Sequence, residues 1–393
     1  MCFWLSCPLK HLKGMHINRP QSCHFGSGLG AWRCLGITGL VSVLILQACG
    51  GVERDSFCDA TQFKPQIPVC EYQGTGCTYG STTLELPTAL GSKPINSADP
   101  DGAIATAGDQ IYFTQPTLNT ITWLKLSAER LVTDSSYAVV STPSFRLKAG
   151  SVSVQPCTGF VYSDSSNRLL VKVKNGFYNN LGSSTNFKQP GPTAMDSSGT
   201  VYVVDLGDPL VSTDPGVLYR IDTSGNITSL VRDVTLRKTT SIAYGNAYNG
   251  VSDRVYLVVN RVLKYVTPSS STPALTDLGP LLSPSAIATD AWGNLYMVEN
   301  QNNLLDTYHR GHGVTKFNSS TLVTTRIAGL FPSSSGTPPA TVTYTQIIGN
   351  ADNETDATLS TFNYPSAISV DNQGIVYVLD RGNMAIRVLK PHS

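Results

Sequence analysis

The sequence predicts an all-β fold, a six-bladed β-propeller of four-stranded antiparallel blades that is closed by an N-terminal strand. Three observations support this prediction: the composition, a segment that recurs along the chain, and a strand-like run before the first copy. Charged residues make up only 14% of the 393 residues, whereas Gly (34) and Pro (23) are abundant. Such a composition favours many short strands joined by turns over long helices.

The N-terminal 48 residues are predicted to be an export signal. Residues 1–33 carry basic but no acidic side chains, and residues 35–48 form an apolar run of about 14 residues. This run is too short to cross a bilayer but has the length of a signal-peptide core. Nothing before Ala48 is therefore expected to belong to the fold.

The apolar run ends in residues 46–49 (Leu-Gln-Ala-Cys), which two glycines follow. This sequence resembles the lipobox of bacterial lipoproteins. The resemblance implies that Cys49 is lipidated and anchors the mature protein to the cell envelope, in the outer membrane because Gly50 rather than an acid follows. An ordinary secretory signal is the alternative, and both Met1 and Met15 stay open as start codons.

The mature chain contains four further cysteines, an even number in an oxidising compartment. They predict two disulfides, in any of three pairings. Zinc binding is the competing interpretation, but the spacing is too wide for a Cys-x-x-Cys pair and no histidine is near. The four candidates are Cys58, Cys70, Cys77 and Cys157.

The charge balance argues against nucleic acid as a partner. Four of the 28 Lys and Arg residues and none of the 27 Asp and Glu residues precede the expected cleavage site, so the mature chain carries 24 basic and 27 acidic side chains, a net charge of −3. This balance lacks the basic excess that binds a phosphate backbone. We expect membrane contact through the lipid anchor only.

A recurring segment predicts the blades. Each clear copy consists of an apolar strand, an Asp-x-x-Gly turn and a second strand with a tyrosine, at residues 192–205, 284–299 and 365–380. Weaker copies begin near Ala103, Val152 and Ser241.

A third strand follows each copy, with a basic residue before an apolar one. The spacing of these residues, about 44 to 52 for the first five copies, suits a four-stranded blade. The basic residue is interpreted as a solvated outer position. These residues are Lys125, Lys172, Arg220, Lys264, Lys316 and Arg387.

Residues 363–390 resemble an NHL repeat almost throughout, including the Asp-Arg-Gly-Asn turn at 380–383. The resemblance is clear over about 280–393 and 190–225 and thin in the first, second and fourth copies. It implies a propeller. Lactonases of this architecture hold a metal with Glu, Asn and Asp at the channel mouth, but their flanking motifs are absent here.

The sixth copy provides three strands, whereas a blade needs four. The strand-like run Ser81–Pro87 is predicted to supply the fourth strand and close the ring, which removes sheet edges that invite aggregation. The interval 331–361 is interpreted as a long loop rather than a seventh blade. We therefore expect a signal peptide over 1–48, a tether with cysteines over 49–78 and the propeller over 79–393.

Insertions in two hairpins and in the connection before the sixth copy indicate a binding face, because elaborated loops on a rigid scaffold tend to carry binding groups. The hairpins are residues 205–216 and 300–313. The candidate residues on this face are Asp205, Asp208, Asp214, Glu299, Asp306, His309, His312, Asp380 and Arg381.

A divalent metal, calcium or zinc, is a possible cofactor, although none is certain. Asp306, His309 and His312 are the weak candidates for zinc or another divalent metal, and residues 352–356 offer calcium-type oxygens without a full loop pattern. The alternative is a polar turn. The acids that end the second strands either cap turns or surround the channel mouth.

No nucleophile motif or phosphate-binding glycine loop is present, so whether the protein is an enzyme stays uncertain. The sequence favours a cell-envelope lipoprotein whose propeller is a binding or scaffold module for a protein, peptide or glycan. The alternative is a metal-dependent hydrolase or lyase of the gluconolactonase or peptidyl-glycine lyase kind.

Overall fold

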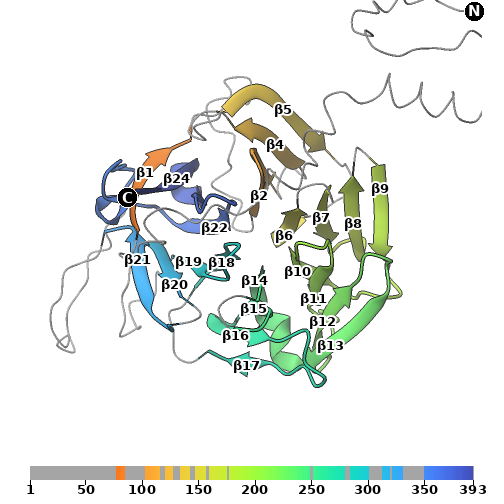
Figure 1. Ribbon diagram of the computed structural model, residues 1–393. Helices are drawn as coiled ribbons and strands as arrows, with labels where there is room; N and C mark the ends of the chain where they lie inside the picture. The colour runs from red at the N-terminus through yellow and green to blue at the C-terminus, as the bar shows by residue number, and fades with distance from the viewer. Residues whose placement is uncertain are drawn as a thin grey trace, which may run out of the picture. The chain divides into compact units, whose positions relative to one another are not determined.

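Six four-stranded antiparallel sheets surround a central channel in the computed structural model of the protein (Figure 1). The structure describes residues 77–84, 102–115, 120–126, 133–141, 147–155, 159–174, 177–247, 251–278, 284–300, 312–318, 321–330 and 349–392. Within these ranges no helix is long and apolar enough to cross a membrane. The predicted six-bladed propeller is confirmed.

Each blade is a meander that runs from the channel to the outside. Blade 1 consists of β2 (Ile104–Ala107), β3 (Gln110–Gln115), β4 (Thr120–Leu126) and β5 (Thr133–Ser141), and blade 2 of β6 (Leu147–Gln155), β7 (Gly159–Asp164), β8 (Leu169–Lys174) and β9 (Phe177–Gly182). Blade 3 consists of β10 (Pro190–Met195), β11 (Val201–Asp205), β12 (Gly216–Ile221) and β13 (Ile227–Asp233).

The last three blades follow the same order. Blade 4 consists of β14 (Thr239–Gly245), β15 (Arg254–Val259), β16 (Val262–Val266) and β17 (Thr276–Asp277), and blade 5 of β18 (Ala286–Thr289), β19 (Leu295–Glu299), β20 (Gly313–Phe317) and β21 (Thr324–Ala328). Blade 6 consists of β22 (Pro365–Val370), β23 (Val376–Asp380), β24 (Ala385–His392) and β1 (Thr78–Thr83). The first strands of neighbouring blades contact each other around the whole ring, including β22 with β2.

The closing strand β1 pairs antiparallel with β24, and this pairing joins the two ends of the described chain. The strand begins at Thr78, three residues before the predicted start. Tyr79 and Ser81 are buried, and a Cβ atom on Gly80 would lie 1.9 Å from the carbonyl oxygen of Glu354. The strand therefore starts earlier than the apolar pattern indicated because small residues fit beneath the connection that precedes blade 6.

A tyrosine in every second strand packs opposite a residue of the first strand. In four of the six blades this partner is alanine, which leaves room for the ring between neighbouring blades. The pairs are Tyr112 with Ala105, Tyr162 with Val152, Tyr202 with Ala194, Tyr256 with Ala243, Tyr296 with Ala288 and Tyr377 with Ser369. The repeated tyrosine is thus the core residue of the blade interfaces.

The basic residue of the third strand does not occupy one shared position. Arg220 pairs with Tyr202, whereas Arg387 pairs with Val378, one residue out of that register. A one-residue slip turns a side chain to the other face of the sheet. Arg387 is therefore fully buried while Arg220 is exposed, and the solvated position expected for this residue is wrong for Arg387.

Candidate functional sites

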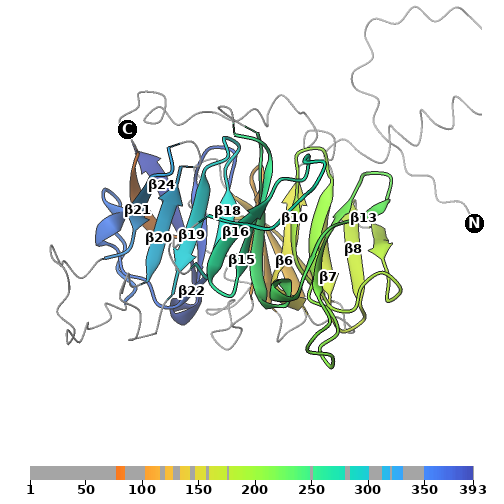
Figure 2. The same cartoon turned by 90° about the horizontal axis from the view of Figure 1, so that it is seen from below.

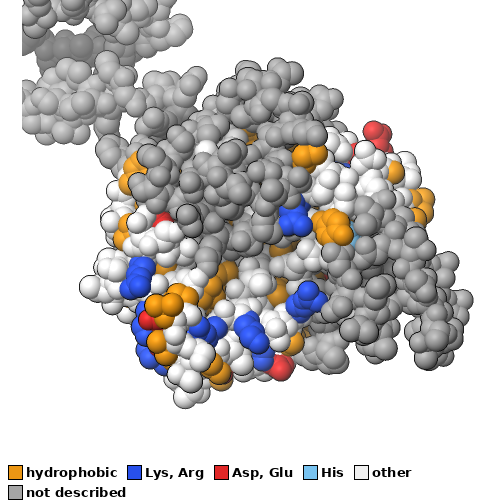
Figure 3. All heavy atoms as spheres, turned by 180° about the vertical axis from the view of Figure 1, so that it is seen from behind, with side chains coloured by type: hydrophobic (Ala, Val, Ile, Leu, Met, Phe, Trp, Pro, Cys, Tyr) orange, Lys and Arg blue, Asp and Glu red, His pale blue; other side chains and the backbone are white. Residues whose placement is uncertain are grey.

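The two ends of the channel carry different loops. We call the end with the hairpins between second and third strands and the connections between blades the connection rim, and the opposite end the turn rim. The strands run between these rims in Figure 2, and Figure 3 looks onto the connection rim. Both elaborated hairpins and the long connection start and finish at strand ends on the connection rim.

The β11–β12 hairpin is held in place by one arginine. Arg237, in the short η4 helix (Val234–Lys238), donates hydrogen bonds of 2.9 Å from Nη1 to the backbone carbonyls of Asp208, Val211 and Asp214. The carboxylate of Asp214 also pairs with Lys188 at 2.7 Å, and this hydrogen bond lowers the pKa of Asp214. The hairpin is therefore ordered without a partner.

The tip of this hairpin exposes aliphatic side chains. Leu210 is 91% exposed and Val211 46% exposed, while Val234 in η4 is 52% exposed. Apolar and basic side chains lie next to each other at the lower left of Figure 3. The hairpin thus presents a rigid apolar tip to the surroundings.

The second elaborated hairpin has a base of the same design. Arg326, from the outer strand β21, pairs with Glu299 at 2.9 Å and donates to the backbone carbonyl of His312 at 2.9 Å. A Cβ on Gly313 would lie 2.0 Å from Nη2 of this arginine. Both hairpins thus combine an acid at the end of the second strand with an arginine from an outer element.

The acids at the ends of the second strands are structural in their contacts. Asp205, Glu299 and Asp380 are buried. Asp205 accepts hydrogen bonds from the backbone N–H groups of Lys188 and Gln189 at 2.8 and 2.6 Å. Burial raises the pKa of Asp380 to about 6 even though it accepts from Asn363 and Arg387. Asp205 and Asp380 thus tie their blades to the connections that enter them, whereas Glu299 pairs with Arg326 and Thr315 within blade 5.

His312 lies in a buried contact with the connection before blade 6. Its Nδ1 accepts the backbone N–H of Tyr364 at 2.7 Å, and the two rings meet edge to face at 4.9 Å. Burial lowers its pKa to about 4, so the ring is neutral with its proton on Nε2. Metal-bound histidines instead donate from the second nitrogen, so this geometry does not favour His312 as a ligand.

The remaining candidates are divided between described and undescribed parts of the chain. Arg381 lies over the Tyr364 ring at 5.9 Å, and Asp208 accepts the backbone N–H of Leu210 at 2.9 Å. Cys77 packs against the core of blades 5 and 6. The other predicted residues lie outside the described residues, namely Cys49, Cys58, Cys70, Cys157, Asp306 and His309.

Within the described ranges, no three His, Cys, Asp or Glu side chains lie together as a metal site would require. In the calcium-type segment, Asp352 binds Ser81, Thr83 and Arg387, and Asp356 caps the η5 turn (Ala357–Leu359) through Thr358. The Asp352 oxygens therefore stabilise the closure of the ring, whereas the Asp356 oxygens stabilise only their own turn.

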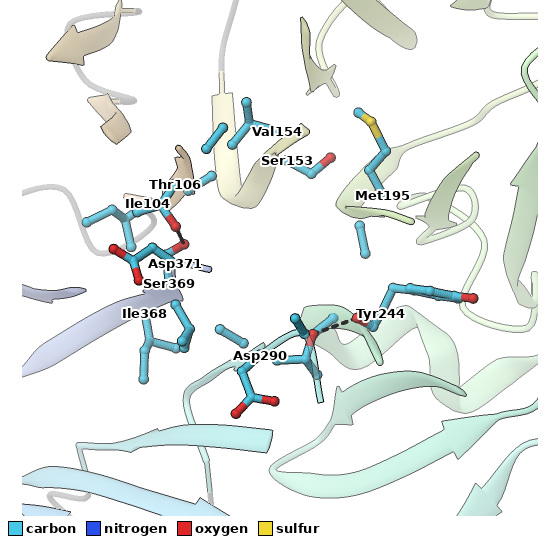
Figure 4. Close-up of a pocket in the computed structure, with 18 of the residues that line it drawn as sticks. Ile104, Thr106, Ser153, Val154, Met195, Tyr244, Asp290, Ile368, Ser369 and Asp371 are labelled. Carbon is cyan, nitrogen blue, oxygen red and sulfur yellow. Dashed lines mark hydrogen bonds between the residues drawn. The ribbon is translucent and has the colours of Figure 1, made fainter. Parts of the chain in front are cut away.

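A cavity that no sequence motif indicated lies in the channel. Its volume is about 700 Å³, and the first strands of all six blades and their following turns line it (Figure 4). Its polar side chains are short, and several lie in the weak repeat copies. Several of these polar residues lie in the first strand, next to the residue that packs opposite the tyrosine of the second strand. If the repeat copies are aligned on that tyrosine, the positions that line the channel are identified.

This fold and its channel define a six-bladed β-propeller, one blade of which matches the NHL repeat. The family model of the NHL repeat matches residues 362–389, which are blade 6 without its closing strand. No curated protein matches the chain.

Solved structures resemble the chain at the level of the fold. An auxiliary nutrient binding protein from Bacteroides ovatus has a TM-score of 0.52 at 12% identity, covering 81% of this chain and 78% of that chain. A protein of unknown function from Bacteroides thetaiotaomicron has a TM-score of 0.51 at 13% identity, with 81% and 77% covered. A putative phosphatase from the same species has a TM-score of 0.50 at 11% identity, with 81% and 79% covered.

Proposed function

We propose that the protein is a lipid-anchored binding module of the cell envelope whose β11–β12 hairpin docks onto a protein partner. The exposed, rigid tip with Leu210 carries this proposal. An apolar side chain that is already ordered enters a partner's pocket with a small entropy cost. Anchoring residues of this kind contribute most of the binding energy in protein interfaces.

The chemistry of the tip favours a protein or peptide over a glycan. Leu210 and Val211 are aliphatic and offer no hydrogen bonds, whereas glycans are recognised through hydroxyl pairing and aromatic stacking. The flanking Asp208 and Asp214 give the tip a polar border, which resembles the arrangement at protein interfaces. The connection rim therefore acts as the docking face.

Leu210→Asp in the full chain tests the docking. In-cell cross-linking followed by purification is expected to recover the partner at least ten-fold less well than with the wild type. The melting temperature is expected to change little because the side chain is exposed. The matched control is Leu322→Asp, since Leu322 is 64% exposed in the turn between β20 and β21 on the turn rim. Equal recovery with both variants contradicts the proposal.

The anchor is tested separately, because the docking face does not depend on it. We expect the mature N-terminus to be a diacylglyceryl-modified Cys49, detected by mass spectrometry, and Cys49→Ser to leave the membrane fraction. A mature chain that starts at another residue would show an ordinary secretory signal. The pairing of Cys58, Cys70, Cys77 and Cys157 is read from the same peptides under non-reducing conditions.

A further inference from the structure

The cavity in the channel lies away from the docking hairpin. It is bordered by the turns after the first strands, which belong to the turn rim, whereas Leu210 projects from the connection rim. A volume of about 700 Å³ is within the range of small-molecule sites. The cavity is therefore large enough for a ligand of its own.

Among the described residues, the lining of the cavity contains two carboxylates, each of which accepts backbone hydrogen bonds from its own turn. None of the described residues that line it is Lys, Arg or His. The carboxylates of Asp290 and Asp371 point away from the cavity in Figure 4. Asp290 accepts the backbone N–H groups of Trp292 and Asn294 at 3.0 and 2.9 Å. A charged ligand would lose its hydration here without meeting a counter-charge.

Two neighbouring blades contribute buried hydroxyl groups that lack hydrogen-bond partners. Ser153 in β6 and Thr193 in β10 are 8% and 4% exposed, and neither hydroxyl oxygen has a partner. The Oδ1 atom of Asn372, in the turn of blade 6, is a third unpaired group of the lining. A buried hydroxyl without a hydrogen-bond partner destabilises the fold, so these groups favour a ligand that pairs with them.

Other hydroxyls in the same lining are paired, so the unpaired groups stand out. Thr106 and Ser369 bond to each other at 2.9 Å across blades 1 and 6, and Thr289 donates to the carbonyl of Tyr244 at 2.6 Å. Much of the remaining surface is aliphatic and includes Val154, which lies beside Ser153 in Figure 4. The cavity thus combines hydrogen-bonding groups with apolar walls.

We infer that this cavity binds a small uncharged molecule with several hydroxyl groups, of the size of a mono- or disaccharide. The hydroxyls of Ser153 and Thr193 rotate toward the channel and pair with ligand hydroxyls on one side, and the Asn372 carbonyl turns to accept from the ligand on the other side. The aliphatic walls contact the C–H faces of the sugar ring. The site is separate from the docking hairpin and needs no protein partner.

Isothermal titration of the detergent-solubilised full mature protein tests this site. The probes are glucose, N-acetylglucosamine, maltose and cellobiose, with glucose 6-phosphate and glucosamine as charged counterparts. We expect at least one neutral probe to bind and its charged counterpart to bind at least ten-fold more weakly. Absence of binding for all four neutral probes, or equal binding of a charged counterpart, overturns the inference.

The double variant Ser153→Ala with Thr193→Val tests the residues. The variant is expected to bind the neutral probe at least ten-fold more weakly than the wild type does. Its melting temperature is expected to stay the same, since the removed hydroxyls are unpaired. The matched control is Thr228→Val with Ser229→Ala on the exposed outer strand β13, which is expected to bind as the wild type does. Unchanged binding by the channel variant refutes the site, and Leu210→Asp is expected to leave sugar binding intact.

Discussion

The seam that closes the ring and the wall of the channel treat polar groups in opposite ways. At the seam, Arg387 donates to Asp352, Asp380 and the carbonyls of Ala351 and Thr361, and its side chain is 1% exposed. In the channel wall, buried hydroxyls stay unpaired. The difference teaches that the fold pairs its buried charges where the chain ends must be joined, whereas two buried hydroxyls of the channel wall stay unpaired.

The largest expected effect concerns the seam. Arg387→Ala leaves two carboxylates near each other without their cation, so we expect a loss of about 3 to 5 kcal/mol in the free energy of unfolding, measured by urea denaturation. Arg387→Lys is expected to lose less, because the charge stays but most of the guanidinium hydrogen bonds do not. Arg220→Ala, at an exposed site in blade 3, is the control and is expected to change stability by less than about 0.5 kcal/mol. Similar losses for both alanine variants would remove the distinction between these arginines.

The second prediction concerns one turn motif in two environments. Asp290 and Asp222 each accept hydrogen bonds from two backbone N–H groups and an asparagine amide. Burial raises the pKa of Asp290 to about 6, whereas the hydrogen bond from Asn226 lowers the pKa of Asp222. The two turns therefore respond to pH in opposite directions.

For Asp290, the folded protein holds a proton that the unfolded chain releases between about pH 4 and pH 6. The free energy of unfolding then falls as the pH rises through this window, by an amount on the order of 2 kcal/mol. Asp290→Asn is expected to remove this fall, measured by urea denaturation at pH 4 to 7. Asp222→Asn is expected to change the pH profile in the opposite direction. The Asp222 carboxylate stabilises the fold at neutral pH, and this contribution is lost at low pH. Parallel pH profiles for Asp290→Asn and the wild type would contradict the assignment.

The smallest effect is expected at the hydroxyl contact between Tyr79 of the closing strand and Tyr296 of blade 5, whose oxygens are 3.3 Å apart. Tyr79→Phe removes this hydrogen bond and keeps the packing, so we expect a loss of about 1 kcal/mol in the free energy of unfolding. Tyr178→Phe is the control, since Tyr178 is 54% exposed. Thermal melts of both variants test this: the melting temperature is expected to fall for Tyr79→Phe and to stay the same for Tyr178→Phe.

The sequence predicted the fold well because the propeller repeats one interface. The tyrosine of the second strand recurs in six blades, so even the weak copies at Ala103 and Val152 were found. The closing strand was expected from the missing fourth strand, but its start was displaced, since Gly80 and Ser81 are buried against the connection that contains Glu354. A search for apolar residues does not identify a strand whose buried positions are occupied by glycine and serine.

The candidate site was less predictable, because its properties depend on register and on pairing. Arg387 shares its motif with Arg220, yet a slip of one residue separates a buried ion pair from a solvated side chain. Ser153 and Thr193 are ordinary strand residues in the sequence, and only the arrangement of the six blades shows that their hydroxyls are unpaired. The acids at the strand ends were interpreted as turn caps or as a ring around the channel mouth, and the sequence did not show that they are buried.

The pairing of Thr78 with His392 also determines the order in which the molecule is able to fold. Blades 1 to 5 take their strands from consecutive segments, so each of them has all its strands as soon as its own segment is free to fold. Blade 6 has to wait for β24, and only then does β1 find its partner. Contacts of such long sequence separation form slowly, and until they form the first-made strand is an open edge. The last step of folding is therefore the one that removes the hazard of aggregation.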